Sequence, residues 1–488
     1  MSGAIPFVSS RGLRVLGEAV LYRVFAAIPS VVVPQCYERA HYLRSVLLGA
    51  FLTQPPIPMQ VWEWICTMPS RRRKQLVRAF KAREELGEDS PEYEIIKAFV
   101  KTELLPYFGV ADGDYSVFQV EYVARLIQAP HDETHLDAGP YLKPLVQRLK
   151  ETWSWEHWLF YASVSPEKLD KWLNKHRGAT SWFWSDYSSF DSTYSAHTWR
   201  MIERFYQQIY PEAPESLWKA LNAWRKPHGK VRSHRDDAKL EYFAPIMNAS
   251  GRDDTALANA LVNGIVLALS FTAVLAGKSI ESLEEADVLW ASRQFSIAVV
   301  GDDSLVACSF DVRPLVGAIE GKIRRFGLVA KCFSSEELCD VTFLGMMPYP
   351  VAGDLYWGPT IGRRLYKAFW QADPKGNLPA WTLGVAKQLA LYQCVPVLSE
   401  IANRVCTLLD GGKITRQAVD ENRVWSARSS ATPPYDYSTM VWMCKRYREQ
   451  GLVPRAMAAD VETVERIDRL PAIVRLLTVD ASLLVDDL

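Results

Sequence analysis

The sequence predicts an α+β fold divided into several subdomains, and three observations lead to this prediction. Residues 150–350 alternate strand-like apolar runs with helix-like segments, which is typical of a mixed fold. Residues 1–100 and 376–488 are instead mostly helical in periodicity, as in Leu383–Leu409 and Val461–Leu477. The chain has 488 residues and so exceeds the roughly 250–300 residues at which a single hydrophobic core stops growing.

The composition fits a globular protein and gives no global indication of a partner. Hydrophobic residues make up 49% of the chain, enough to bury sizeable cores. Lys and Arg together count 56, as do Asp and Glu, so the formal net charge is zero. A nucleic-acid partner would therefore need a local basic surface, offset by an acidic site elsewhere.

The cysteines and the apolar segments indicate a reducing compartment and no membrane span. None of the eight cysteines forms a Cys-x-x-Cys pair or a cluster with zinc spacing, so we expect free thiols. No signal peptide is visible at Met1. The apolar stretches Phe25–Pro34 and Val46–Leu52 are shorter than the ~20 residues that a spanning helix needs.

A basic run is the first notable feature of the helical N-terminal region. It comprises Arg71, Arg72, Arg73 and Lys74 and continues through Arg78, Lys81 and Arg83. Such a run is either a solvated helix face or a surface that binds nucleic-acid phosphates. Two short apolar strands, Tyr115–Val120 and Tyr122–Gln128, are expected after it among Gly and Asp turns.

Acidic residues follow the next predicted strand. Trp182–Trp184 is expected to be a strand, with Asp186 at its end and Asp191 five residues later. A carboxylate at a strand end can share one pocket with carboxylates from a neighbouring hairpin. Mg²⁺ prefers such a site, with a few carboxylates, substrate phosphates and water as its ligands.

A small-residue turn and a helix with a polar edge come third. Ser250-Gly251 allows a close approach of the backbone to a ligand, and Asp253 or Asp254 can cap a helix that continues to about 269. Thr255 and Asn259 are four residues apart and share one face of this helix, and Asn263 extends the row. The alternative interpretation is a capped core helix with a polar edge.

A β-hairpin with two acidic residues at its tip is predicted over Ser296–Ala307. The apolar runs Ile297–Val300 and Leu305–Ala307 flank Gly301-Asp302-Asp303. Adjacent carboxylates repel each other and are costly to desolvate, so such a pair favours a bound divalent cation. The alternative is a solvent-exposed turn, because Asp is a favoured turn residue.

These elements, in this order, resemble the palm of viral RNA-dependent RNA polymerases. The surrounding residues, notably Asp186–Ser195, look most like those of positive-strand RNA viruses of the tombusvirus and nodavirus kind. The matching residues are Asp186 and Asp191 for motif A, Ser250, Gly251, Thr255 and Asn259 for motif B, and Gly301, Asp302 and Asp303 for motif C. Each motif is weak to moderate alone, and three in order are far more specific.

The resemblance extends, less specifically, to a basic segment before the palm. Lys101–Glu103 and Arg125–Gln128 look like the fingertip motif F, in which Lys101 and Arg125 would meet the incoming triphosphate. The alternative for this segment is a surface hairpin. The resemblance also makes the basic run at Arg71 to Lys74 a candidate RNA-binding surface.

Two further segments resemble motifs that follow the palm hairpin. Phe326–Lys331 is similar to motif D, which implies that Lys331 protonates the leaving pyrophosphate; a solvated lysine is the alternative. Thr342–Gly345 looks like motif E, a hairpin that supports the end of the growing strand, or else a plain strand between palm and thumb. Gly358–Tyr366 would then lead into the thumb.

The architecture implied by the resemblance is a right-hand polymerase with fingers, an antiparallel palm sheet and a helical thumb. We expect the N-terminal extension and fingers at 1–150, the palm at 151–350 and the thumb at 351–488. A fingers insertion is expected near 206–245, and a Pro- and Ser-rich loop, Ser426–Tyr435, within the thumb.

The implied reaction is attack of an RNA 3′-hydroxyl on the α-phosphate of a nucleoside triphosphate. Asp186, Asp302 and Asp303 would hold two Mg²⁺ ions, or Mn²⁺. RNA template, product strand and nucleoside triphosphates are the implied partners, together with other replication proteins. The implied location is the host cytoplasm, at membrane-associated replication sites if a partner supplies the anchor.

Two other functions stay open at this point. A reverse transcriptase usually has an aromatic residue and another residue before its two hairpin aspartates, where this chain has Val300-Gly301. A catalytically silent RNA-binding protein of the replication complex would keep the fold, but Asp186, Asp302 and Asp303 are all present here.

Overall fold

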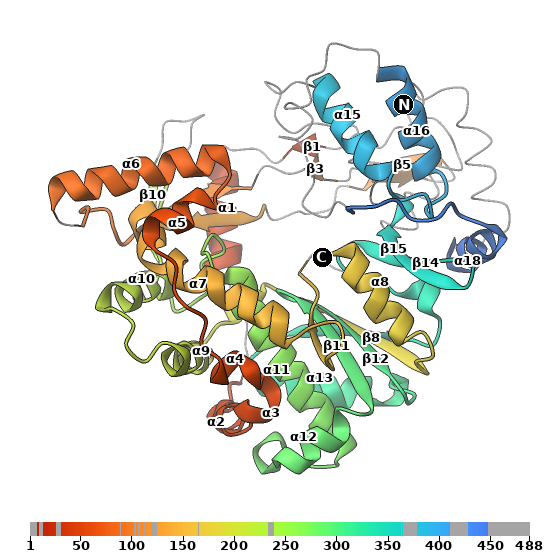
Figure 1. Cartoon of the computed structure of the whole chain (residues 1–488), viewed down its shortest axis with the longest axis horizontal. Coiled ribbons are helices and arrows are strands. Elements are labelled where there is room, and N and C mark those ends of the chain that lie inside the picture. The colour runs from red at the N-terminus through yellow and green to blue at the C-terminus, as the bar shows by residue number, and fades with distance from the viewer. Residues whose placement is uncertain are drawn as a thin grey trace.

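The computed structural model shows a mixed fold in which most strand pairs are antiparallel (Figure 1). It describes residues 7–8, 13–25, 31–87, 89–101, 104–105, 108–111, 114–118, 124–163, 165–232, 239–362, 364, 378–409 and 428–447. The prediction of a mixed helix-and-strand class is confirmed. All eight cysteines lie within these residues and are free thiols, as expected.

A five-stranded sheet forms the centre of the molecule. Its strands, in spatial order, are β13 (Ala330–Ser335), β8 (Ser181–Tyr187), β12 (Asp303–Cys308), β11 (Phe295–Val300) and β7 (Leu159–Tyr161). Strands β11 and β12 form the predicted hairpin, and only the β11–β7 pair of this sheet is parallel. β11 and β12 are almost wholly buried, because apolar elements cover both faces of the sheet.

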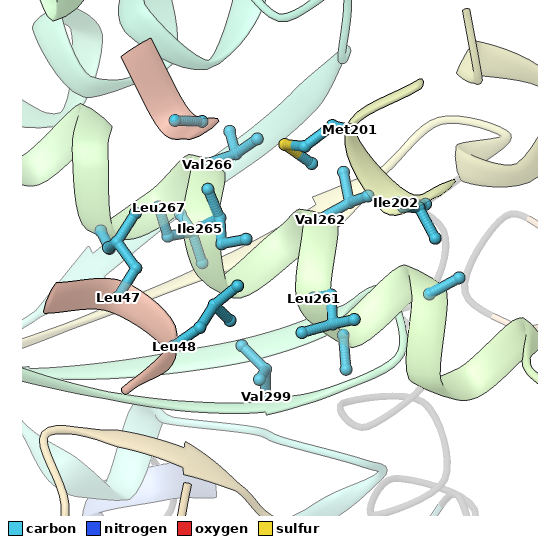
Figure 2. Close-up of a cluster of buried hydrophobic side chains, with 14 of the residues drawn as sticks. Leu47, Leu48, Met201, Ile202, Leu261, Val262, Ile265, Val266, Leu267 and Val299 are labelled. Atoms are coloured by element: carbon cyan, nitrogen blue, oxygen red, sulfur yellow. The ribbon is translucent and has the colours of Figure 1, made fainter. Parts of the chain in front are cut away.

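One face of the sheet packs on α11 (Thr255–Leu275) and α13 (Val316–Arg324). Figure 2 shows part of this core, where side chains of α11 such as Leu261 and Ile265 lie near Val299 of β11 and Leu48 of α3. Burial of these side chains stabilises the fold by about 1.5–3 kcal/mol each. α11 therefore supports one face of the sheet.

α11 is apolar around its whole circumference because protein surrounds it. Among the described residues, α11 is the helix that is long and apolar enough to cross a membrane. However, 94% of its most apolar 18-residue stretch is buried inside the protein. This burial identifies α11 as a core helix and agrees with the expectation of no membrane span.

The other face of the sheet packs on α8 (Pro166–Lys175). Trp172 of α8 meets Trp182 of β8 edge to face, with ring centroids 6.1 Å apart. α8 also packs on the hairpin of β14 (Met346–Val351) and β15 (Asp354–Pro359), whose Trp357 backbone N–H donates to Asp170. The segment Thr342–Gly345 is the turn that enters this hairpin, with Leu344 and Gly345 at positive φ.

A second sheet combines distant segments in the order β10-β9-β2-β6. These strands are β10 (Lys239–Phe243), β9 (His228–Arg232), β2 (Ile95–Val100) and β6 (Leu126–Ala129), and α1 (Leu13–Val24) packs on β2 and β6. The segment near 206–245 therefore shares a sheet with the N-terminal region. Helices α5 (Val61–Cys66), α6 (Ser70–Leu86) and α7 (Asp132–Thr152) lie in the same part of the molecule (Figure 1).

Helices dominate the described C-terminal residues, as predicted. They are α15 (Leu378–Leu389), α16 (Leu398–Leu409) and α18 (Tyr437–Tyr447). The helical periodicity over Leu383–Leu409 belongs to two helices, α15 and α16, which residues 390–397 separate; there Pro396 lacks a backbone donor and Val397 has φ +66°. Residues 428–436 form a loop as predicted, and Val461–Leu477 lies outside the described residues.

The remaining elements surround these two sheets. They are β1 (Phe7–Val8), β3 (Leu104–Leu105), β4 (Phe108–Ala111), β5 (Asp114–Phe118), α2 (Pro34–Tyr42), α3 (Arg44–Leu48), α4 (Ala50–Thr53), α9 (Ala196–Ile209), α10 (Glu215–Arg225), α12 (Glu285–Ala291) and 3₁₀ turns at Phe190–Thr193, Ile280–Ser282, Arg313–Leu315 and Leu338–Asp340. β5 pairs with β4, a strand that the sequence did not indicate. The strand predicted at Tyr122–Gln128 begins later, at Leu126, in the described part of the chain.

Candidate active site at one end of the central sheet

The β11–β12 hairpin presents two aspartates at a tight turn. Val300 pairs with Asp303, so Gly301 and Asp302 form a two-residue loop. Gly301 has φ +61°, and a β-carbon there would meet no other atom within 4 Å. Its backbone angle rather than a lack of space therefore calls for glycine, as in a type II′ turn. Asp302 and Asp303 are both exposed at this tip.

Strand register brings the other predicted catalytic residues to the same end of the sheet. Asp186 of β8 pairs with Lys331 of β13 on one side. On the other side Ser185 pairs with Ser304 of β12, so continuing the register by one residue sets Asp303 across from Asp186. Directly opposed residues of antiparallel strands point to the same face. Asp303, Asp186 and Lys331 thus form a polar row across three strands.

Asp302 is exposed to solvent, and neighbouring protein also surrounds part of its carboxyl. This surrounding protein raises the pKa of Asp302, while the charge of Arg125 acts in the opposite direction. Lys101 lies beside Arg125, because its backbone N–H donates to the Arg125 carbonyl at 2.8 Å. The two basic residues predicted to meet a triphosphate are therefore neighbours, and the charge of Arg125 acts on the hairpin tip.

Ser250 and Gly251 join the strand that follows Arg125. The Ser250 hydroxyl accepts from the Gln128 N–H at 3.2 Å and donates to the Leu126 carbonyl at 3.3 Å. The Gly251 N–H donates to the Gln128 carbonyl at 2.9 Å, and a β-carbon on Gly251 would lie only 2.5 Å from that oxygen. The close backbone approach predicted at Gly251 is thus made to β6. A nucleotide contact by these two residues stays a prediction.

The polar row of α11 connects three separate parts of the site. The Thr255 hydroxyl donates to the backbone carbonyl of Ala249 at 3.1 Å and so fixes the loop before the helix. One turn further on, Asn259 donates to Asp191 at 3.0 Å. Asn263 donates to the Asp302 carbonyl at 2.8 Å, with longer contacts to the carbonyls on either side. The predicted row therefore links the loop before α11, Asp191 and the turn of the β11–β12 hairpin.

Asp191 lies in a cluster of amides beside this row. Its Oδ1 accepts from Asn259 Nδ2 and from Asn248 Nδ2, each at 3.0 Å. Burial raises the pKa of Asp191 to about 6, even though these two amides stabilise its charged form; the charge of Asp302 raises it further. The sequence predicted the Asp191–Asn259 pair, and the structure brings it together within the described residues.

Sequence reasoning missed the residues that hold this pair. Asn248 is completely buried, and Arg252 and Asp254 form an ion pair with fully buried side chains. Asp254 stands at the N-cap position of α11, but its side chain does not cap the helix. It pairs instead with Arg252 and accepts from the Tyr206 hydroxyl at 3.0 Å. The predicted capping role was therefore wrong for Asp254. The adjacent charges at 252–254 were the only feature of the sequence that hinted at a buried ion pair.

The basic run at the start of α6 divides into two groups. Arg72 pairs with Asp132, and Arg73 donates to the carbonyls of Cys66 and Met68 at 2.6 and 3.1 Å. Arg71 and Lys74 are exposed, and among the described residues no ion pair involves either. They continue at helical spacing into the exposed Arg78 and Lys81, so one face of α6 forms a basic stripe. The RNA-binding prediction is untested and now concerns that stripe.

The donor set at the sheet end fits a divalent cation of the Mg²⁺ kind. Among the described residues, no group of three or more His, Cys, Asp or Glu side chains forms a ready-made metal site. Mg²⁺ is usually bound by one or two carboxylates with water and substrate phosphates, so it does not need such a cluster. Asp186 and Asp303 on adjacent strands and Asp302 at the tip could supply such carboxylates. A cation there would favour the charged form of Asp302, which the surrounding protein disfavours.

Comparison of the chain with models of protein families finds no match, and comparison with curated proteins finds none either. The resemblance to viral polymerases therefore rests on the three motifs.

Proposed function

We propose that the protein is an RNA-directed RNA polymerase that replicates or transcribes a viral RNA genome. The observation that supports this most is the alignment of Asp186 between Lys331 and the hairpin aspartates at one end of the sheet. The Asp191–Asn259 pair joins the same site through α11. A phosphoryl transfer needs mainly positioning and charge stabilisation, and these groups can supply both.

Each group has a distinct role in this proposal. Asp186, Asp302 and Asp303 would hold Mg²⁺ or Mn²⁺, which stabilises charge on the attacking and leaving oxygens when bound. Lys331 would donate the proton to the leaving pyrophosphate. Lys101 and Arg125 would bind the triphosphate.

Asp191 and Asn259 would recognise the ribose 2′-hydroxyl. A site built to hydrogen-bond a hydroxyl rejects the analogue that lacks it, because its own polar groups are then left unpaired. Ser250, Gly251 and Thr255 would shape the same nucleotide site from the loop before α11. The proposal includes a right-hand arrangement of fingers, palm and thumb. It also includes an RNA template and a product strand, accompanying replication proteins, and a location in the host cytoplasm.

The test is incorporation of labelled nucleotide on a homopolymeric RNA template with Mg²⁺ or Mn²⁺. We expect ribonucleotide incorporation by the natural chain and none by Asp302→Asn, which removes one carboxylate while keeping shape. Melting temperature and RNA affinity of Asp302→Asn should stay close to those of the natural chain.

Two outcomes would favour other functions. Incorporation of deoxynucleotides alone would indicate a reverse transcriptase. RNA binding without any incorporation would indicate a silent RNA-binding protein, and an active Asp302→Asn variant would refute the carboxylate assignment.

A further inference from the structure

We propose that Asn248 is a positioning residue for sugar selection, because it holds Asp191 and Asn259 in one fixed arrangement. This inference rests on the proposed polymerase function and on the sugar-recognition role of that pair. It adds a residue outside the motif positions that carry the resemblance. Asn248 lies before the Ser250-Gly251 turn and is completely buried.

A single amide group of Asn248 contacts both members of the pair. Its Nδ2 lies 3.0 Å from Asp191 Oδ1 and 2.8 Å from Asn259 Oδ1. The backbone N–H of Asn248 also donates to the Asp191 carbonyl at 2.9 Å. Side chain and main chain of Asn248 therefore both fix Asp191, which follows a different strand and is distant in the sequence.

These contacts determine which way the Asn259 amide faces. Asn259 Oδ1 accepts from Asn248 and from the Tyr194 hydroxyl, the latter at 2.7 Å. With two donors at its oxygen, the Asn259 amide must turn its nitrogen toward Asp191. Among the described residues no donor reaches Asp191 Oδ2, so that oxygen remains as an acceptor for a ligand hydroxyl.

Arg252 fixes the orientation of Asn248 in turn. Arg252 donates from Nη1 to Asn248 Oδ1 at 2.7 Å and pairs through Nη2 with Asp254. Because a guanidinium only donates, the oxygen of Asn248 must face Arg252 and its nitrogen must face Asp191. A flipped Asn248 amide would set two donors against each other in a buried site.

Two tryptophans hold Arg252 in place from outside the site. Its guanidinium lies 4.0 Å from the ring centroid of Trp199 in α9 and 5.3 Å from that of Trp224 in α10. Trp199 also donates from Nε1 to the Met247 carbonyl at 3.1 Å, next to Asn248. The arrangement is thus supported by helices that carry none of the motif residues.

The consequence concerns selectivity more than overall rate. Without the Asn248 amide, Asp191 and Asn259 keep their mutual bond, and Asn259 keeps the Tyr194 hydroxyl, but the two lose the group that contacts both and fixes their shared geometry. A ribonucleotide loses part of its hydroxyl recognition, whereas a 2′-deoxynucleotide has no such contact to lose. The ratio of kcat/KM for a ribonucleotide over its deoxy analogue should therefore fall about tenfold in Asn248→Ala, as for one lost buried hydrogen-bond partner.

The experiment measures this ratio in the natural full chain and in four variants. Asn248→Ala removes the amide, and Asn248→Asp keeps the shape and the acceptor for Arg252 but cannot donate to Asp191. Asn259→Ala serves as the reference for loss of selectivity. Ile265→Val is the control for general destabilisation, because it trims the buried core of α11 without touching the polar cluster, and should affect both nucleotides equally.

A fall in the ratio for both Asn248 variants, with the ratio of Ile265→Val unchanged, would support the proposal. An unchanged ratio in an active Asn248 variant, or a similar fall in Ile265→Val, would overturn it. If neither Asn248 variant folds, the residue is structural and the proposal is overturned. A natural chain that incorporates no nucleotide would refute the proposed function itself, an outcome distinct from the others because it appears before any variant is compared.

Discussion

Asn263 should be the residue whose loss most loosens the hairpin turn without removing a carboxylate. Its Nδ2 donates to the carbonyls of Gly301, Asp302 and Asp303, the best bond being 2.8 Å to Asp302. Its Oδ1 accepts from the Tyr187 hydroxyl at 2.9 Å. Asn263 is completely buried, so water cannot replace these bonds without local opening.

The magnitude follows from the bonds lost in Asn263→Ala. The net contribution of the bond to the turn is about 1 kcal/mol, and a buried Tyr187 hydroxyl left without an acceptor costs about 1–3 kcal/mol. The free energy of opening the turn should therefore fall by about 3 kcal/mol, which corresponds to about 100-fold more frequent opening. Displacement of the hairpin aspartates should lower nucleotide incorporation by about 10²-fold.

Hydrogen exchange of the peptides that cover β11 and β12 measures the opening directly, and incorporation measures its effect. Tyr187→Phe is the matched variant, because it removes the hydroxyl but leaves the Asn263 donors in place. It should speed exchange much less than Asn263→Ala. Unchanged exchange around residues 299–306 in a folded Asn263→Ala protein would show that the turn does not depend on this side chain.

Three further predictions concern other parts of the chain. Lys331→Leu should slow nucleotide incorporation by about 10²–10⁴-fold at unchanged RNA affinity, with partial recovery and a shifted pH profile in Lys331→His; a change in affinity alone would contradict the proton-donor role. The double variant Arg71→Gln with Lys74→Gln should lower the salt slope of RNA binding by about 2, since each lost phosphate contact lowers it by about 1; an unchanged slope would exclude the stripe on α6. Burial lowers the pKa of His176 to about 4, so at this residue the folded state binds fewer protons than the unfolded state between pH 4 and 6.5, and its contribution to stability should rise with pH across that window. In urea titrations His176→Gln should lose this contribution, and a pH profile identical to that of the natural chain would refute the argument.

The parts of the site that follow from near neighbours could be predicted from the sequence. The hairpin at Gly301 depends on a glycine between two apolar runs, and its turn has the backbone angle that glycine favours. The helix over Thr255–Leu275 depends on a long apolar run, and the spacing of Thr255, Asn259 and Asn263 places them on one face. The order of the aspartates along the chain was likewise enough to suggest one carboxylate site.

Other features arise only when distant segments pack together. The pairing of Lys331 with Asp186 depends on strand register, because a shift of one residue would send either side chain to the other face. The division of the basic run depends on where Asp132 and the carbonyl end of α5 lie, which no local pattern records.

The amide cluster around Asp191 shows the same limit most clearly. Asn248 has no periodicity or spacing that marks it, and only the adjacent charges at 252–254 hinted at Arg252, since Asp191 and the tryptophans around Arg252 belong to distant segments. Local propensity determines which elements form, whereas burial of a polar group requires a partner that only the folded chain brings within hydrogen-bond distance. The sequence by itself therefore determined the hairpin, the core helix and the candidate carboxylates, and the tertiary structure decided which side chains hold them in place.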